Sequence, residues 1–206
     1  MAFRVGVLVS GRGTNLQALI DRVHRCEGIE IVAVASNRAD AQALERARRA
    51  GIETAVFSAS SYPDRAARDR ALADWLAERA VDLVVLAGFM EILSAEFVDR
   101  FRWRIVNVHP ALLPAFPGTR AIEQALEYGV KVTGVTVHFV DEGVDTGPII
   151  LQEAVPVPYS RDVSELEERI HAVEHRLLPE AVRLIARGAV RPDERSPRIV
   201  HVAQDV

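Results

Sequence analysis

Short apolar runs alternate along this chain with longer segments in which apolar residues recur every three or four positions. The runs are typical of buried strands, and the recurring pattern is typical of helices that pack by one face. In the first half, strands are expected at residues 3–10, 29–36, 53–57, 81–89 and 102–109. Helices are expected between them at residues 14–25, 39–51, 60–80 and 91–101. This alternation predicts a parallel sheet with helices on both faces.

The pattern changes after residue 110. A helix is expected first, then two strands joined by a short acidic loop, which predicts an antiparallel pair, and then a long helix. These elements cover residues 118–129, 132–140, 147–157 and 163–187. We therefore expect an α/β fold: a Rossmann-like three-layer sandwich whose mostly parallel sheet has an antiparallel C-terminal strand. Residues 1–190 are expected to form a single domain, followed by a polar, proline-broken C-terminal tail at 191–206.

Composition narrows the class of protein. The 206 residues are 49% hydrophobic and 26% charged, with a net charge of -4, which is ordinary for a globular protein. Acidic and basic residues are mixed, which argues against a nucleic-acid partner. The only cysteine, Cys26, excludes an intrachain disulfide and a multi-cysteine metal site. The first apolar run is too short for a membrane span and lacks a signal-peptide layout, so we expect a cytoplasmic protein without a membrane partner.

Candidate ligand sites lie where the predicted parallel strands end. The turn "SGRGTN" at residues 10–15 has two glycines and opens into a helix, whose N-terminus is suited to a phosphate. A plain strand-to-helix turn with Thr14 as N-cap is the alternative. In "AGFMEILS", Phe89, Met90, Ile92 and Leu93 are apolar where loops are usually polar. They could line a slot for a flat heteroaromatic ligand, although packing of the next helix is favoured by this stretch alone.

Asn107 and His109 are two residues apart in "RIVNVHP", so both should point to one side of a strand that Pro110 ends. That position leaves a catalytic and a structural role equally open. The loop "DEGVDTGP" at 141–148 is either a solvated turn or the source of a carboxylate that orients His109. The two histidines of "HAVEH" lack a third metal ligand, so no metal is expected, and His138 and His24 are interpreted as structural.

Four segments together resemble the folate-dependent phosphoribosylglycinamide formyltransferases of purine biosynthesis. They are "SGRGTNLQALI", "LAGFMEILS", "NVHPALLPAFPG" and "VTVHFVDEGVDTGPIILQ", joined by the "EH" pair at residues 174–175 of the last predicted helix. The resemblance runs from about residue 3 to 179. It implies a formyltransferase fold and formyl transfer from 10-formyltetrahydrofolate, a co-substrate, to the amine of 5-phosphoribosylglycinamide. The products would be formylglycinamide ribonucleotide and tetrahydrofolate. We expect only small-molecule partners of this kind, no metal, and a monomer or homodimer.

The resemblance also implies roles for individual residues. The catalytic residues would be Asn107, His109 and Asp145. The ribonucleotide would be bound by Gly11, Arg12, Gly13, Thr14, Asn15, Pro110 and Glu174. The folate would be bound by Arg65, Met90, Glu91, Ile92, Leu93, Asn107, Val140, Asp141, Glu142, Gly143 and Val144.

Two positions depart from the family pattern: Glu91 stands where relatives often have Arg, and Arg120 where a His is common. If the family's folate contact at residue 91 is made by the backbone, little changes. If the side chain meets the glutamate tail of the folate, the reversed charge would weaken binding.

Four rival functions share parts of these motifs. A formyltetrahydrofolate hydrolase would carry an extra N-terminal regulatory domain, and a methionyl-tRNA or sugar formyltransferase an extra C-terminal one. A folate- or nucleotide-binding sensor would have lost turnover, which the presence of Asn107, His109 and Asp145 argues against. A nicotinamide dehydrogenase is disfavoured because the full glycine fingerprint is missing.

Overall fold

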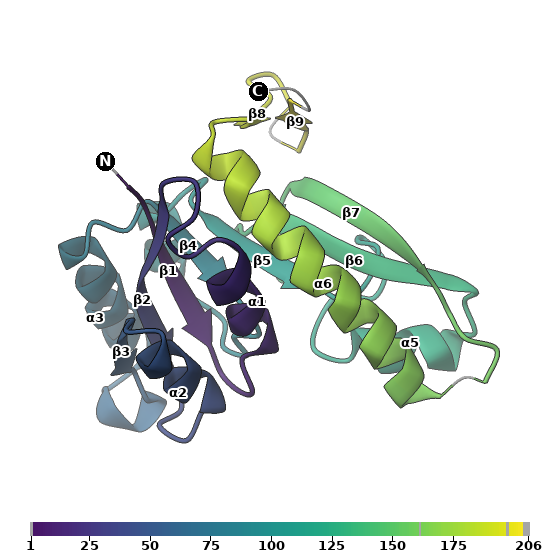
Figure 1. The fold of residues 1–206 in the computed structure, drawn as a ribbon, viewed down its shortest axis with the longest axis horizontal. Coiled ribbons are helices and arrows are strands. Elements are labelled where there is room, and N and C mark those ends of the chain that lie inside the picture. Colours follow the sequence, from purple (N-terminus) through teal and green to yellow (C-terminus); the bar gives the residue numbers. More distant parts are fainter. Residues whose placement is uncertain (1, 161, 197, 204–206) are drawn as a thin grey trace. The chain divides into compact units, whose positions relative to one another are not determined.

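The computed structural model describes residues 2–160, 162–196 and 198–203. The chain divides into two compact units, Met1–Asn107 and Val108–Val206. The single domain expected over residues 1–190 stays a prediction. Figure 1 shows the elements of both units with their labels.

The first unit is built on a parallel sheet, as the alternation predicts. Its strand order is β3-β2-β1-β4-β5, and each neighbouring pair runs parallel. The strands are β1 (Phe3–Val9), β2 (Ile29–Ser36), β3 (Glu53–Val56), β4 (Leu83–Leu86) and β5 (Ile105–His109). β5 pairs with β4 as far as Asn107. All four residues of β4 are buried, which is why this segment reads as a continuous apolar run.

Helices flank this sheet. They are α1 (Thr14–Arg22), α2 (Gln42–Arg49), α3 (Arg65–Glu78) and α4 (Ala95–Arg100), with a short 3₁₀ turn, η1 (Ala59–Ser61). α1 packs on α2, and α3 packs on α4. Figure 1 shows α1 and α2 in front of the strands and α3 behind them, an arrangement that closes the apolar strands between two helical layers.

Two helices begin later than the apolar pattern indicates. Ser61 or Tyr62 before a first-turn Pro63 would start α3 early, but it begins at Arg65, because the Asp64 side chain accepts the N–H of Ala67. Likewise, α4 begins only after Ser94, whose hydroxyl accepts the N–H of Phe97. Residues 91–94, expected to be helical, therefore form an irregular turn at the carboxyl end of β4.

The second unit is built on an antiparallel pair of strands, which confirms the predicted hairpin. Its elements are α5 (Ala121–Tyr128), β6 (Val132–Phe139), β7 (Ile149–Pro156), α6 (Val163–Ala186), β8 (Val190–Pro192) and β9 (Val200–Val202). The long helix α6 packs on β6 and β7 (Figure 1). β8 and β9 pair antiparallel, so the described part of the predicted tail forms a small hairpin. Residues 197 and 204–206 of that tail lie outside the described residues.

Candidate functional site

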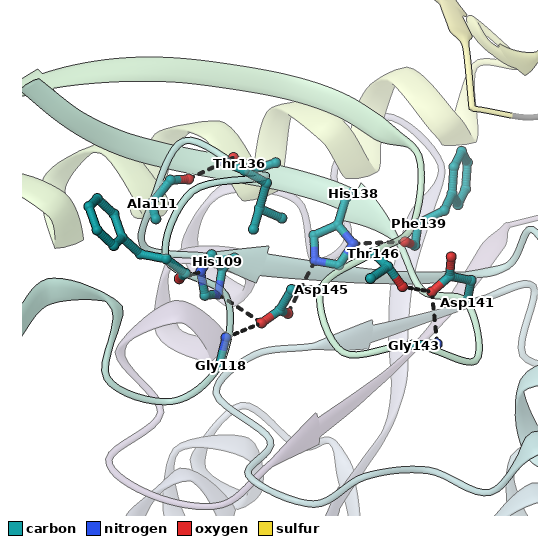
Figure 2. Close-up of polar contacts among 12 residues, drawn as sticks. His109, Ala111, Gly118, Thr136, His138, Phe139, Asp141, Gly143, Asp145 and Thr146 are labelled. Atoms are coloured by element: carbon teal, nitrogen blue, oxygen red, sulfur yellow. Dashed lines mark hydrogen bonds and ion pairs between the residues drawn. The ribbon is translucent and has the colours of Figure 1, made fainter. Parts of the chain in front are cut away.

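In the second unit, one carboxylate faces two imidazoles (Figure 2). His109 ends β5, His138 lies on β6, and Asp145 lies in the loop after β6. Nδ1 of His109 is 3.4 Å from Oδ2 of Asp145, and Nε2 of His138 is 3.6 Å from Oδ1. The same Oδ2 accepts the backbone N–H of Gly118 at 2.8 Å. The acidic loop therefore supplies the carboxylate beside His109 that its composition suggests.

The far nitrogen of each imidazole contacts a backbone carbonyl. Nε2 of His109 lies 2.8 Å from the oxygen of Phe116, and Nδ1 of His138 lies 2.8 Å from the oxygen of Phe139. A carbonyl only accepts hydrogen bonds, so both of these nitrogens carry hydrogen. In a neutral imidazole the other nitrogen has none, so on His109 the nitrogen that faces Asp145 is the one that gains or loses a proton.

Burial and charge compete at this cluster. Burial lowers the pKa of His109 and outweighs the opposing effects of the Asp145 carboxylate and the Phe116 carbonyl. Burial alone would raise the pKa of Asp145, but hydrogen bonds from His138 and from the N–H of Gly118 outweigh it and lower the pKa. Asp145 is therefore a half-buried anion beside a histidine whose pKa is lowered by burial and raised by that anion, an arrangement suited to moving a proton.

The loop that carries Asp145 is shaped by internal hydrogen bonds. Oδ1 of Asp141 accepts the N–H of Gly143 at 3.1 Å and the hydroxyl of Thr146 at 2.6 Å. A Cβ at Gly143 would collide with the Thr146 hydroxyl, so a side chain there would displace that hydroxyl from Asp141. From the tail, Nη1 of Arg198 donates to the backbone oxygen of Thr146 at 3.1 Å. These contacts give a reason for the acidic and glycine residues of this turn. They also hold Thr146, the residue next to Asp145.

In the first unit, the turn after β1 requires glycine at residue 13. Gly13 has φ of 74°, and a Cβ there would lie 2.5 Å from the Cβ of Ala43 on α2. Gly13, not Thr14, is the N-cap of α1, so the alternative of a Thr14 cap is wrong. Thr14 and Asn15 occupy the first turn of a nine-residue helix, where backbone N–H groups suit a phosphate.

The turn after β4 divides its apolar residues between two roles. Leu93 is buried, which fits the packing role expected for this stretch. Met90 and Ile92 are 66% and 58% exposed, which packing does not explain. The N–H of Met90 donates to the hydroxyl of Ser10 at 2.9 Å, which ties this turn to the loop after β1. Neighbouring apolar side chains exposed at a strand end are typical of a ligand surface.

The other residues implied by the resemblance lie in one unit or the other. In the first unit, Gly11 and Arg12 are exposed, Arg65 is the exposed first residue of α3, and Asn107 is half-buried. In the second, half-buried residues are Pro110, Val140 and Asp141, and exposed residues are Glu142, Gly143 and Val144. Glu174 is buried on α6. Asn107 and His109 belong to different units, so their shared direction stays a prediction from strand alternation.

The contact of His138 with Asp145 is the feature that sequence reasoning missed, because His138 was interpreted as structural. A signal for it exists: Thr136 and His138 are two residues apart in an apolar strand and share a face. Thr136 donates to the backbone oxygen of Ala111 at 2.7 Å, so this face meets the segment after His109. No group of three or more metal-ligating side chains suited to a metal ion occurs among the described residues.

Comparison with known proteins identifies the family. The family model for formyl transferases matches residues 3–182. Phosphoribosylglycinamide formyltransferase of Escherichia coli is 44% identical over 192 residues, 92% of this chain and 90% of that protein. The trifunctional purine biosynthetic protein adenosine-3 of Bos taurus is 50% identical over 203 residues, 98% of this chain. The chain spans about a fifth of the length of that trifunctional relative.

A solved structure shows the same architecture. The crystal structure of glycinamide ribonucleotide transformylase 1 from Symbiobacterium toebii is similar with a TM-score of 0.93 and 50% sequence identity. The match covers 98% of this chain and 95% of the other. It confirms the expected fold class, a mostly parallel sheet with helices and an antiparallel C-terminal hairpin. The sequence match over most of the chain and the structural match agree, and this chain belongs to the formyl transferase family.

Proposed function

We propose that this chain transfers the formyl group of 10-formyltetrahydrofolate to the amine of 5-phosphoribosylglycinamide, a step of purine biosynthesis. The Escherichia coli relative, which this chain matches over 90% of its length, carries the name of this activity. The observation that supports the chemistry most directly is the 3.4 Å approach of Asp145 to His109. That pair provides a half-buried anion and a titratable base at the end of a strand.

The reaction requires proton transfer but no protein nucleophile. The amine nitrogen forms a bond to the formyl carbon, the bond from that carbon to N10 of the folate breaks, and one proton passes from the amine to N10. Charge develops on the formyl oxygen in between. The amide N–H of Asn107 is suited to stabilise that oxygen, and one such donor contributes about 3–4 kcal/mol in known enzymes. His109 would stabilise the same oxygen or move the proton.

The orientation of His109 assigns different tasks to its two nitrogens. Nδ1 faces the Asp145 carboxylate, which favours a proton there and so favours the imidazolium. Nε2–H donates to the Phe116 carbonyl, and an oxygen of the substrate would take the place of that carbonyl. Asp145 is thus proposed to act through His109, by orienting its ring and stabilising its charged form.

The surfaces in each unit support binding roles that the family resemblance implies. The turn at residues 10–15 and the N-terminus of α1 would hold the ribonucleotide phosphate, with Pro110 and Glu174 also contacting this substrate. The exposed side chains of Met90 and Ile92 fit an apolar heteroaromatic ligand, so residues 90–93 would contact the folate. Arg65 and the 140–144 loop, which exposes Val144, are proposed to contact the same molecule.

An absorbance assay tests this proposal. The protein is mixed with 10-formyltetrahydrofolate, and tetrahydrofolate release is followed with and without phosphoribosylglycinamide. Release that requires the amine supports formyl transfer. Release without the amine would indicate a hydrolase, and tight folate binding with no release would indicate a sensor; either result refutes the proposal.

None of the helices that the structure describes has the length and apolar character needed for a membrane span. We propose a cytoplasmic protein that acts on small molecules as a monomer or homodimer, without nucleic acid. Analytical ultracentrifugation would test the assembly: a larger oligomer at assay concentration would contradict it.

A further inference from the structure

Glu91, one of the two residues that depart from the family pattern, is held by two partners of the first unit. Its Oε2 lies 3.1 Å from Nη1 of Arg68, and its Oε1 accepts from Nδ2 of Asn37 at 3.0 Å. The hydrogen bond from Asn37, and then that from Arg68, lower the pKa of Glu91. The carboxylate is therefore ionised and directed toward the protein, whereas the neighbouring Met90 is exposed.

The buried pair of Arg68 and Asp69 contacts both ends of the turn at residues 91–94. Their side chains are 2% and 0% exposed, and Nε of Arg68 donates to Oδ1 of Asp69 at 2.9 Å. Oδ2 of Asp69 accepts the backbone N–H of Ser94 at 2.6 Å. One buried ion pair on α3 thus reaches residue 91 through Arg68 and residue 94 through Asp69. The 90–93 segment lies between these two attachment points.

Ser10 extends the network to the loop after β1. Its hydroxyl donates to Oδ1 of Asn37 at 2.7 Å and accepts the N–H of Met90. Ser10 directly precedes the glycine turn, and Asn37 directly follows β2. Hydrogen bonds therefore connect the carboxyl ends of β1, β2 and β4, where ligands of parallel sheets bind.

We propose that Glu91 is a positioning residue: paired with Arg68 and Asn37, its carboxylate holds the 90–93 segment in the conformation that receives the folate. This inference rests on the proposed function, because it assumes that the segment contacts the folate. It also accounts for the departure from the family pattern, since a cation at residue 91 would face the buried guanidinium of Arg68. Any contact of the folate at residue 91 would then be made by the backbone.

Steady-state kinetics of Glu91→Ala and Glu91→Gln test the proposal. We expect Glu91→Ala to raise KM for 10-formyltetrahydrofolate about tenfold, with kcat and the KM for the ribonucleotide within about twofold, because the catalytic groups lie elsewhere. Glu91→Gln keeps one acceptor and should raise the folate KM only about threefold. A lowered Tm with an unchanged folate KM in both variants would show a purely structural role and overturn the proposal.

Arg68→Met completes a double-mutant cycle. Because the pair acts as a unit, Arg68→Met/Glu91→Ala should raise the folate KM no more than the worse single variant, whereas simple multiplication of the two effects would contradict the proposal. Arg68→Met leaves Asp69 buried without its cation and could fail to fold, in which case the Glu91 variants decide alone. Glu96→Ala is the control, because Glu96 on α4 also pairs with an arginine of α3, Arg70, but at the surface and outside the 90–93 segment.

Glu91→Arg separates positioning from a direct contact with the glutamate tail. Positioning predicts a higher folate KM, since two cations would then face each other. A lower KM, most of all for a polyglutamylated folate, would mean that side chain 91 meets the tail and would overturn the proposal. The wild-type assay comes first: absence of transfer refutes the proposed function and with it this inference. Transfer in the wild type with an unchanged folate KM in Glu91→Ala refutes this inference alone.

Discussion

Nε2 of His138 lies 3.6 Å from Oδ1 of Asp145, the carboxylate oxygen that His109 does not face. The aspartate therefore does not serve His109 alone. A substitution of either ring changes the surroundings of the carboxylate that the other ring faces. Substitutions at these positions should affect the rate of the chemical step more than the binding of either substrate.

Asp145→Asn should lower kcat by about 10²–10⁴-fold, the usual contribution of a group engaged in proton transfer. The amide keeps the shape of the side chain but removes the charge that favours the imidazolium of His109. The KM values of both substrates should change by only a few-fold. Steady-state kinetics check this, and a kcat near that of the wild type would exclude Asp145 from the catalytic unit.

His138→Asn should lower kcat less, by roughly tenfold, because the imidazole faces Asp145 and its direct effect on the pKa of His109 is the smallest of those that act on that ring. The loss should depend on pH, because the hydrogen bond from His138 is the largest of the effects that lower the pKa of Asp145. His24→Asn, in the first unit, is the matched control and should leave kcat unchanged. An identical pH–rate profile for His138→Asn and wild type would contradict the expectation.

Stability should fall as the solution is acidified. The folded-state pKa of His109 lies below its ordinary value of 6.5, so the unfolded chain takes up this proton at a higher pH than the folded chain. The free energy of unfolding is therefore greatest above pH 6.5 and falls as pH drops through the folded pKa. Asp145, whose pKa is also lowered, contributes a further loss below its ordinary 3.8.

Urea denaturation between about pH 7.5 and about pH 5 measures the first of these effects. Burial also lowers the pKa of His24, so His24→Gln should remove one part of the slope and His109→Gln another. Only the His109 variant should also lose activity. A free energy of unfolding that rises on acidification over this interval would contradict the assignment.

Gly13→Ala should destabilise the fold by about 1–3 kcal/mol, because the added Cβ meets Ala43 and the backbone has a positive φ. It should also raise the KM for the ribonucleotide, since the start of α1 must shift. Gly11→Ala is the control, because a Cβ there meets no atom within 4 Å. Thermal unfolding and kinetics check both; equal stability of the two variants would count against the packing argument.

Arg198→Ala should raise the KM for 10-formyltetrahydrofolate a few-fold and change stability by less than about 1 kcal/mol, as expected for an exposed hydrogen bond. The reason is that Arg198 holds the backbone oxygen of Thr146, beside the proposed folate loop. Arg195→Ala removes an exposed arginine of the same segment and should have no such effect. Kinetics that do not distinguish the two variants would show that the tail leaves the loop unaffected.

Hydrophobic periodicity was sufficient to predict the types and order of the main elements as far as α6, and β2 has the predicted bounds. It did not predict the β8–β9 hairpin in the tail. The starts of α3 and α4 were missed because capping by Asp64 and Ser94 decides them, and apolar spacing does not report a cap. The expectation that residues 91–94 are helical came from the same error. Once Ser94 caps α4, the preceding residues are released from the helix and become available to a ligand.

The sequence by itself determined the strand–helix alternation, the glycine turn after β1, and the His109 and acidic-loop pair as candidates for one site. Only the tertiary structure decided that Asp145 also faces His138, and that Glu91 is directed to Arg68 and Asn37. Periodicity reports which face of its own element a residue occupies. Which charged group a residue meets depends on packing between segments far apart in the chain. Burying an unpaired charge costs so much free energy that a buried charge needs a partner, here from a distant segment.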